Sequence, residues 1–190
     1  MKSCNITTRA ARAEDATVIA LAVAWAIGDP VGLQHYCGTD YLSTLTEIAH
    51  TVGTQYSWQN AIIAECEGVV AGAVVGYDGA RLEELRRGTL TIIRNRTGHT
   101  PTLVDETEAG EYYLDSVAVL PEFRHSGVGR ALVEAFCERA FAEGAERVGL
   151  IVDVQNPKAE ELYRSVGFER VGERTFFGHL MHHLQKPTYK

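Results

Sequence analysis

The most regular alternation of hydrophobic and polar positions lies in the second half of the chain. The apolar run Val117–Leu120 predicts a buried strand that ends before Pro121, because proline has no N–H to donate to a neighbouring strand. A loop that contains Gly127 and Gly129 follows it. The next segment predicts a helix, because its apolar residues recur at helical intervals: Val128, Ala131, Leu132, Ala135, Phe136 and Ala140.

Gly144 ends this helix, and the apolar segment Arg147–Val152 predicts the next strand. A strand, a helix and a strand in this order predict a βαβ unit with two parallel strands. Asn156 and Pro157 are typical of the cap and the first position of another helix, which Gly167 ends. Two final strands are predicted at Phe168–Val171 and Phe176–Leu184.

The first part of the chain predicts one strand and two helices. The strand covers Ile6–Arg9, and Ala13–Asp15 opens a helix that Gly28–Pro30 ends. The inward face of this helix is predicted to be Val18, Leu21, Ala22 and Trp25. Residues 31–38 show no regular pattern. The second helix, capped by Thr39 or Asp40, is predicted from an apolar stripe formed by Leu42, Leu45, Ile48, Ala49 and Val52.

A hairpin is predicted next, because Ala61–Cys66 and Val69–Val75 flank the short link Glu67–Gly68. Both strands are apolar on both faces, which predicts a sheet covered by helices on both sides. Gly72 and Gly76 have no side chain to pack, so we expect another backbone or a ligand close to them. Residues 78–93 predict a helix with an inward face of Leu82, Leu85, Leu90 and Ile93.

The composition is that of an ordinary globular protein, with 45% hydrophobic and 23% charged residues, and we expect residues 1–190 to form one domain. The net charge of −7 gives no electrostatic support for general nucleic-acid binding. No segment approaches the roughly 18 apolar residues of a membrane span, and the first residues lack the apolar centre of a signal peptide. We therefore expect a cytoplasmic protein that binds neither nucleic acid nor membranes.

The cysteines and histidines show no metal-binding spacing. No Cys-x-x-Cys pair occurs, so we expect reduced thiols without a disulfide or a structural zinc site at Cys4, Cys37, Cys66 and Cys137. On a strand, His179 and His183 would face one way and His182 the other, so we expect no metal bound by the three.

The strand, glycine loop and helix N-terminus around Gly127 form a site suited to a pyrophosphate. Small residues let a ligand approach the backbone, and the free N–H groups and helix dipole favour negative charge. A dinucleotide site would instead need Gly-x-Gly-x-x-Gly after the first strand, with an acidic residue about 20 positions later. Leu132 occupies the third glycine position and the unit comes late in the chain, although Asp153 could serve as the acid. The dinucleotide interpretation is therefore the weaker one.

Two segments carry a resemblance to a known family. Val119–Leu132, with the sequence VLPEFRHSGVGRAL, resembles the acyl-CoA-binding motif of the GNAT superfamily of N-acetyltransferases, Arg/Gln-x-x-Gly-x-Gly/Ala. Asn156–Phe168 is similar to the second signature of that superfamily. The order of predicted elements also agrees, less well for residues 78–110. The resemblance implies an α/β fold with a mixed, mostly antiparallel twisted sheet, helices on both faces and one parallel βαβ unit. It also implies acetyl-CoA as cofactor and is compatible with a homodimer.

The resemblance implies how the motif loop binds the coenzyme A diphosphate. Gly127 and Gly129 allow close approach, and we expect loop N–H groups to donate to the phosphates from Arg124, Ser126, Gly127, Val128, Gly129 and Arg130. The Arg124 guanidinium would add a charge-assisted bond, whereas the Arg130 side chain could equally be solvated. His125 stands where Arg, Lys or Gly is commoner, which weakens the positive charge available there.

The same resemblance assigns the pantetheine arm of coenzyme A to the motif strand. Val117 and Val119 would pair with it through their backbone groups, as an added strand does, while their side chains belong to the core. Asn156 caps its helix, and this is compatible with a contact to the pantetheine.

Tyr163 is the candidate general acid. It follows Asn156 by two helical turns on the same face, and a phenol with a pKa of about 10 is protonated at pH 7. It can therefore donate a proton to the thiolate that leaves when an acyl group is transferred. The alternative is a core tyrosine whose hydroxyl is satisfied within the protein.

A base is also expected, because an alkyl amine with a pKa of about 10.4 must lose a proton before it attacks. Glu111, Tyr113 and Asp115 would point to one side of a regular strand, so Glu111 and Asp115 are candidate bases acting through water, although plain surface carboxylates are as compatible. Tyr113 stands near where some histone-type members place a glutamate base. No Lys or Arg occurs from Thr97 to Phe123, so this segment is either solvated surface or an acidic mouth that attracts an amine: Asp105, Glu106, Glu108, Glu111 and Asp115.

The sequence therefore predicts an N-acetyltransferase that transfers the acetyl group of acetyl-CoA directly to the primary amine of a small molecule or a peptide. Holding the thioester and the amine together would supply the orientation that the reaction needs. The alternative is a catalytically silent acyl-CoA sensor or interaction module of the same fold.

Overall fold

A seven-stranded sheet forms the centre of the molecule, in the strand order β1-β2-β3-β4-β5-β7-β6. The computed structural model describes residues 4–176 and 178–188. Neighbouring strands are antiparallel except β4 and β5, which are parallel, so the predicted mixed and mostly antiparallel sheet is confirmed. The strands are β1 (Ile6–Ala10), β2 (Ala61–Cys66), β3 (Val69–Asp78), β4 (Tyr112–Val119), β5 (Arg147–Asp153), β6 (Glu169–Phe176) and β7 (His179–Pro187).

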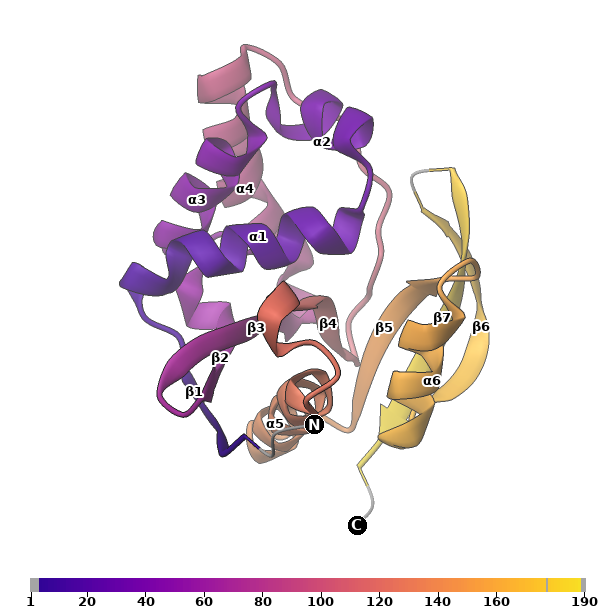
Figure 1. Cartoon of the computed structure of the whole chain (residues 1–190). Helices are drawn as coiled ribbons and strands as arrows, with labels where there is room; N and C mark the ends of the chain where they lie inside the picture. The colour runs from indigo at the N-terminus through magenta and orange to yellow at the C-terminus, as the bar shows by residue number, and fades with distance from the viewer. Residues whose placement is uncertain (1–3, 177, 189–190) are drawn as a thin grey trace.

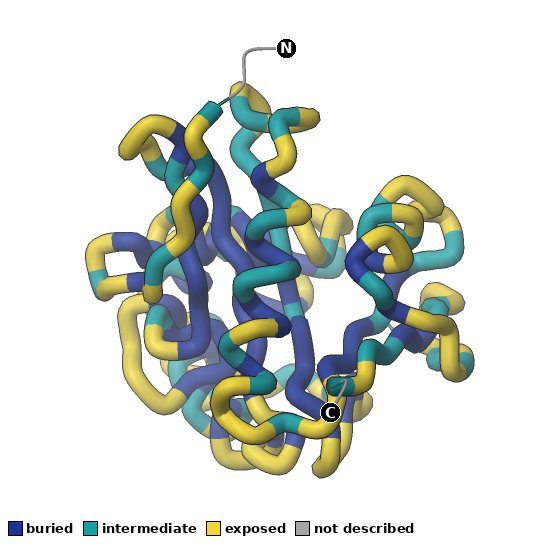
Figure 2. The backbone as a smooth tube through the Cα atoms, turned by 90° about the horizontal axis from the view of Figure 1, so that it is seen from below, coloured by how far each residue is buried: buried dark blue, intermediate teal, exposed yellow. Residues whose placement is uncertain are grey.

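Helices cover both faces of the sheet, as predicted (Figure 1). One face carries α1 (Ala16–Ile27), α2 (Pro30–Cys37), α3 (Tyr41–His50) and α4 (Leu82–Thr97), and the other carries α5 (Val128–Ala142) and α6 (Pro157–Ser165). The strands β2 and β3 separate two apolar clusters, since Ile62 and Val74 pack toward α5 whereas Ile63 and Val75 pack toward α1 and α3. Figure 2 shows these central strands as the buried middle of the molecule.

Two glycines of β3 let neighbouring elements approach closely, as the sequence predicts. A Cβ atom at Gly72 would overlap the carbonyl oxygen of Ala118, and one at Gly76 would overlap the carbonyl oxygen of Tyr113 and the ring of Phe136. The absence of side chains at these positions therefore lets β4 and α5 pack directly on β3.

The helical region before the hairpin differs from the prediction in two respects. Residues 30–37 form α2, which Asp29 caps by accepting a hydrogen bond from the N–H of Val31, with Pro30 at the first helical position. The short helix has apolar and polar residues intermixed, so periodicity alone does not reveal it. The predicted inward face of α1 is confirmed for Ala22 only. Ile19 and Val23 are buried instead, Val18 and Leu21 are half-buried, and Trp25 is 39% exposed. Because α1 contains many alanines, its sequence is compatible with more than one buried face.

Other boundaries shift without changing the topology. In α3 the buried stripe is Leu45, Ile48 and Ala49, while Leu42 and Val52 are exposed. The last hairpin turns at Gly178. Its first strand extends to Phe176, five residues further than predicted, and its second strand begins and ends three residues later than predicted. The edge strand β6 is largely exposed and polar, so it lacks the apolar run that marks buried strands. Phe177, which the prediction places in the last strand, lies outside the described residues.

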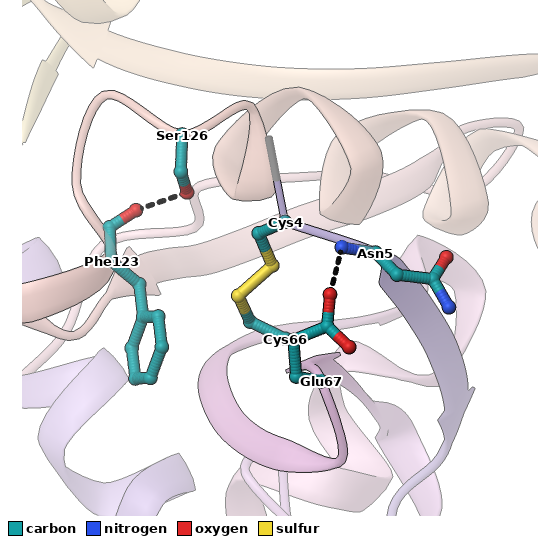
Figure 3. The surroundings of a disulfide bond; sticks show 6 residues. All are labelled: Cys4, Asn5, Cys66, Glu67, Phe123 and Ser126. Atoms are coloured by element: carbon teal, nitrogen blue, oxygen red, sulfur yellow. Dashed lines mark hydrogen bonds between the residues drawn. A yellow bond between two sulfur atoms is a disulfide. The ribbon is translucent and has the colours of Figure 1, made fainter. Parts of the chain in front are cut away.

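The prediction that all cysteines are free thiols is wrong for one pair. Cys4 and Cys66 form a disulfide with a Cα–Cα distance of 5.8 Å, whereas Cys37 and Cys137 are free and buried. Pairing of β1 with β2 places Ile6 opposite Cys66, so the residue two positions before Ile6 reaches the end of the hairpin. Figure 3 shows the disulfide beside a hydrogen bond from the Asn5 N–H to the Glu67 carboxylate. The pair is separated by 62 residues, and only the folded sheet brings it together.

Within residues 4–176 and 178–188, no helix has both the length and the apolar character that a membrane crossing requires.

The parallel strands β4 and β5 separate soon after they begin. They pair at Tyr112–Val148 and Tyr113–Gly149, and beyond this point no pairing between them is recorded. The strand β4 continues along β3 on one side, while β5 continues along β7 on the other, and the two ribbons diverge (Figure 1). One edge of β4 is therefore left without a strand partner in the middle of the sheet.

The close packing at Gly76 predicts a large effect of a single methyl group. Replacing Gly76 with Ala should lower the free energy of unfolding by about 1–3 kcal/mol, because backbone and ring atoms already fill the space. Gly172→Ala is the matched control, since no atom lies within 4 Å of a Cβ atom there. Urea denaturation of both variants tests this, and equal stability of the two would contradict the packing argument.

Candidate active site

The motif loop leaves the N-terminus of α5 open to solvent. Gly127 precedes the helix with a φ of 94°, a left-handed conformation that suits glycine, and no side chain caps the helix. The first helical bond in this turn runs from the Ala131 N–H to the Gly127 carbonyl, at 3.0 Å. The N–H groups of Val128, Gly129 and Arg130 therefore precede the helical bonding pattern and can donate to an anion.

The basic side chains of the loop have different surroundings. Arg124 lies 5.6 Å from the ring centroid of Trp25, and its Nε donates to the carbonyl of Val119 over 3.3 Å. His125 has a φ of 61°, a left-handed conformation that glycine adopts more easily than other residues. Arg130 donates to the Glu134 carboxylate and to the Ser165 carbonyl, both at 2.8 Å, so its guanidinium joins α5 to the end of α6.

The second motif forms α6 and its cap. The Asn156 Oδ1 accepts a hydrogen bond from the N–H of Ala159 over 3.3 Å, which confirms the predicted cap. Tyr163 is 8% exposed, and its ring packs edge-on against Phe168 with centroids 6.0 Å apart. Among the described residues its hydroxyl makes no hydrogen bond, and burial raises the pKa of Tyr163 to about 12. The hydroxyl is thus a protonated, unpaired donor at neutral pH.

A cavity of about 560 Å³ lies where β4 and β5 diverge. Its volume is within the range of small-molecule sites. It unites several predicted site residues from both motifs and the intervening strand: Asp115, Val117, Val119, Gly129, Asn156 and Tyr163. The other predicted residues of the motif do not line it: Arg124, His125, Ser126 and Gly127 belong to the loop before α5, and Val128 and Arg130 belong to its first turn.

Asp115 enters the cavity because β4 is irregular at this residue. Ser116 pairs with Val75 and Leu114 pairs with Gly76, so Asp115 is the extra residue of a β-bulge. Its carboxylate accepts from the Ser116 hydroxyl at 2.8 Å and lies 3.2 Å from the Tyr77 hydroxyl.

A second carboxyl group, which the prediction included only within the acidic run, lies on the same tyrosine. The Glu106 Oε1 is 3.1 Å from the Tyr77 hydroxyl and accepts from the Gln55 amide over 3.2 Å. Glu106 is 8% exposed, and burial together with the nearby Asp115 charge raises its pKa. Burial likewise raises the pKa of Asp115. The two groups therefore form one acidic pair, in which Glu106 is buried and Asp115 is half-buried.

Glu111 lies apart from this pair and does not line the cavity. Its carboxylate accepts from the side chains of Thr107 at 2.7 Å and Gln185 at 2.9 Å, and lies 3.0 Å from the His183 Nε2. Burial alone would raise the pKa of Glu111, but these hydrogen bonds outweigh it and lower the pKa. The structure thus separates the two predicted base candidates, and Glu111 belongs to a contact between the start of β4 and β7.

The other two histidines of β7 contact different carboxylates. His179 lies 2.9 Å from Asp153 and His182 lies 2.8 Å from Glu160. Among the residues that the structure describes, no group of three or more His, Cys, Asp or Glu side chains is arranged to hold a metal ion.

Comparison with known proteins identifies the family of this fold. A sequence profile of the acetyltransferase (GNAT) family matches residues 33–168, which is more than half of the chain. The chain belongs to the GNAT acetyltransferase family. The order of strands, the glycine loop and α6 are therefore those of a GNAT protein, and the resemblance that the two motifs carry is confirmed.

Individual GNAT relatives agree with this assignment. N-alpha-acetyltransferase RimI from Mycobacterium tuberculosis is 35% identical over 103 residues, which make up 54% of this chain and 50% of RimI. A crystal structure described as an acetyltransferase is 31% identical, with a TM-score of 0.81 and coverage of 96% of this chain and 100% of that one. The YncA structure from Salmonella typhimurium, solved with acetyl-CoA, shares the fold at 18% identity and a TM-score of 0.61, over 98% and 95% of the chains. This chain matches only part of the length of its curated relatives. The matched region makes up 50% of RimI and 24% and 21% of two other relatives.

Several residues of this GNAT site are not evident from its motifs. Tyr77 and Gln55 come from segments without a motif. Gln55 lines the cavity, and Tyr77 lies behind its wall, where its hydroxyl contacts Gln55, Glu106 and Asp115. Glu106 shows only the signal of the acidic run, which does not distinguish it from the exposed Glu108 beside it. The positions of these residues depend on sheet pairing, which a local pattern does not encode.

The Glu111 contact predicts a stability effect that depends on pH. Glu111→Gln should lower the free energy of unfolding at pH 7 by about 1–3 kcal/mol, because a carboxylate oxygen surrounded by donors becomes an NH₂ group. The folded-state pKa of Glu111 is lowered from 4.5, so the carboxylate contributes stability above that pH and loses it as the pH falls through the folded-state pKa. The difference from wild type should therefore shrink in acid.

Denaturant unfolding between pH 7 and pH 3 measures this dependence. Glu108→Gln serves as control, because the Glu108 side chain is 74% exposed and its replacement should change stability little. A Glu111→Gln deficit that stays constant with pH would refute an ionised contact.

Proposed function

We propose that this GNAT protein transfers the acetyl group of acetyl-CoA to a primary amine, with Tyr163 as the general acid. The observation that carries the proposal is the unpaired Tyr163 hydroxyl in the wall of a cavity that also contains Gly129 and the acidic pair. Family membership supports acetyl transfer, and the YncA structure with acetyl-CoA supports the coenzyme.

The residues of the chain fit this coenzyme in two places. The uncapped N-terminus of α5 offers N–H groups and positive dipole to a diphosphate, and Gly129 has no atom closer than 3.5 Å to where a Cβ would stand. The free edge of β4 at Val117–Val119 offers backbone groups to an extended amide-containing arm. The Val119 carbonyl already accepts from Arg124, so Val117 is the stronger partner for that arm.

The protein's own groups then act on the reaction in a ternary complex. Acetyl-CoA, when bound, supplies the thioester that an amine can attack. Asn156 fixes the start of α6 and thereby the position of Tyr163 two turns later. Tyr163 holds a proton that can pass to the sulfur as the carbon–sulfur bond breaks, so that a neutral thiol leaves instead of a thiolate.

The diphosphate assignment predicts different outcomes for the two glycines that flank α5, Gly127 and Gly144. Gly127→Trp should abolish acetyl-CoA binding, because the indole occupies the space before the helix N-terminus. Gly144→Trp is the matched control, since Gly144 follows the same helix with a φ of 92° and has no atom within 4 Å. Both variants carry a similar backbone strain of about 1–3 kcal/mol. Calorimetry measures binding, and wild-type affinity in Gly127→Trp would rule out this loop as the site.

The general-acid role predicts a loss of turnover without a loss of affinity. Tyr163→Phe should reduce kcat by about 10²-fold or more, because the ring keeps its contact with Phe168 but cannot donate a proton. Tyr112→Phe is the control, since the Tyr112 hydroxyl donates to Glu143 outside the cavity and is not needed for transfer.

Thiol release from acetyl-CoA in the presence of an amine panel measures turnover, and calorimetry measures coenzyme affinity. Wild-type kcat in Tyr163→Phe would remove this residue from the mechanism. Tight acetyl-CoA binding by the wild-type protein without transfer to any amine would favour the sensor or interaction module instead.

A further inference from the structure

Two carboxyl groups that line the cavity, Glu106 and Asp115, lie on the same hydroxyl behind its wall. The Tyr77 oxygen lies 3.1 Å from Glu106 and 3.2 Å from Asp115, and it also accepts from the Gln55 amide over 3.0 Å. A tyrosine hydroxyl has a single hydrogen to donate, so it can satisfy only one carboxylate. The other carboxyl group must carry its own proton to bond with the same oxygen. The geometry therefore favours a pair that shares one proton and bears one negative charge.

The described part of the cavity wall is acidic, and an imidazole is the only basic side chain that lines it. Among the described residues that line it, the carboxylates Asp29, Glu106, Asp115 and Asp153 face a single histidine, and no Lys or Arg is present. Arg86 approaches the pair from behind, with its Nη2 4.0 Å from Glu106, while it also pairs with Asp105. The field inside the cavity consequently favours a cation.

A separate polar atom beside the pair lacks a partner. Gln55 lines the cavity and is 1% exposed, and both of its amide donor contacts, to Tyr77 and Glu106, are accounted for. Its carbonyl oxygen Oε1 is buried without a hydrogen-bond donor. Leaving a buried acceptor unpaired costs about 1–3 kcal/mol, so such an atom in a binding cavity calls for a donor from a ligand.

We propose that the acceptor is a small aliphatic primary amine, bound as an ammonium ion by Glu106, Asp115 and Gln55, and that the carboxyl pair removes its proton. This inference rests on the proposed acetyl transfer. An ammonium group supplies three N–H donors and one positive charge, which match an unpaired acceptor and a singly charged pair. The buried side chains of Tyr36, Tyr56 and Tyr113 wall this end of the cavity and suit a small acceptor.

The basicity of the carboxyl pair determines which class of amine it is suited to deprotonate. An alkyl ammonium has a pKa of about 10.4, whereas the α-amino group of a peptide has a pKa of about 8 and is partly neutral without help. Burial raises the pKa of both Glu106 and Asp115 above the ordinary carboxyl range, and the Asp115 charge raises the pKa of Glu106 further, which makes the pair a better proton acceptor than a solvated carboxylate. The pair is therefore suited to the strongly basic class.

The proposed step conserves atoms and charge. The ammonium gives one proton to the carboxyl pair, and the nitrogen lone pair then forms the C–N bond as the C–S bond electrons pass to sulfur. Tyr163 gives its proton to the sulfur and regains one from the nitrogen. One ammonium and one thioester thus yield one amide, one thiol and one proton, which the pair releases to water.

Because the pair must be ionised to act, kcat/KM for alkyl amines should rise with pH through the raised pKa of the pair, nearer to neutrality than an isolated carboxyl group would allow. The titratable and charged groups packed against the pair also contribute to this profile: Tyr36 of α2, Tyr56 before β2, Tyr77 of β3, Arg86 of α4, Asp105 before β4, Tyr113 of β4 and Tyr163 of α6.

The test uses two amines that differ in basicity. Butylamine is protonated at pH 7, whereas the fluorines of trifluoroethylamine keep it largely neutral, so only butylamine needs the base before attack. The double variant Glu106→Gln/Asp115→Asn should lose about 10²-fold or more in kcat/KM for butylamine and much less for trifluoroethylamine, with unchanged acetyl-CoA affinity. Glu138→Gln, an exposed glutamate of α5 outside the cavity, should behave as wild type with both amines.

The single variant Glu106→Gln adds a readout that survives if the double variant does not fold. Loss of the neighbouring carboxyl group should shift the rising limb of the butylamine pH profile to higher pH, because the first negative charge on Asp115 is then no longer stabilised by a shared carboxyl proton. An unshifted profile, equal losses with both amines, or transfer to a peptide N-terminus but not to butylamine would overturn the inference. Transfer to no amine by the wild-type protein would instead refute the proposed function itself.

Discussion

The two parallel strands of the sheet pair only at their first residues, and the candidate site depends on this short contact. Beyond Tyr113 and Gly149, β4 stays with β3 while β5 stays with β7, so the sheet is continuous at one end and open at the other. Unpaired N–H and C=O groups in the middle of a sheet are unfavourable unless another molecule satisfies them. The same divergence that creates the cavity therefore leaves a strand edge ready for an extended ligand, with the N-termini of α5 and α6 beside it.

The remaining contact between these strands is held by a buried charge. Glu111, just before β4, reaches across β5 to His183 and Gln185 of β7, and a Cβ atom at Gly149 would overlap its carboxylate. This places a polar anchor where the strands still touch, while the bulge at Asp115 turns β4 at the point where they separate. The two predicted bases thus have different positions in the sheet. Glu111 holds β4 and β5 together where they pair, whereas Asp115 faces the cavity where they separate.

Local sequence signals account for much of this architecture and little of the acidic end of the site. The motif loop, the cap at Asn156 and the hairpin are predicted correctly, because glycine, proline and capping residues act on their immediate neighbours. The bulge at Asp115 and the Cys4–Cys66 disulfide depend on the register of distant strands, which periodicity cannot reveal. Only Glu106 among the hidden site residues belongs to a noticeable pattern, and its role requires the fold that brings Tyr77 beside it.

The carboxyl pair is a feature that folding alone does not explain. Burial raises the pKa of Glu106 and of Asp115, and an acid whose pKa is higher in the folded state lowers stability once the pH exceeds its unfolded value. Amide or apolar side chains of similar size would fill the same space without this penalty. Conflicts of this kind between stability and local chemistry concentrate at functional sites. A cation that enters the cavity stabilises the ionised pair. Binding therefore relieves the electrostatic cost that the pair has in the free protein, and this relief favours the binding of an ammonium ion.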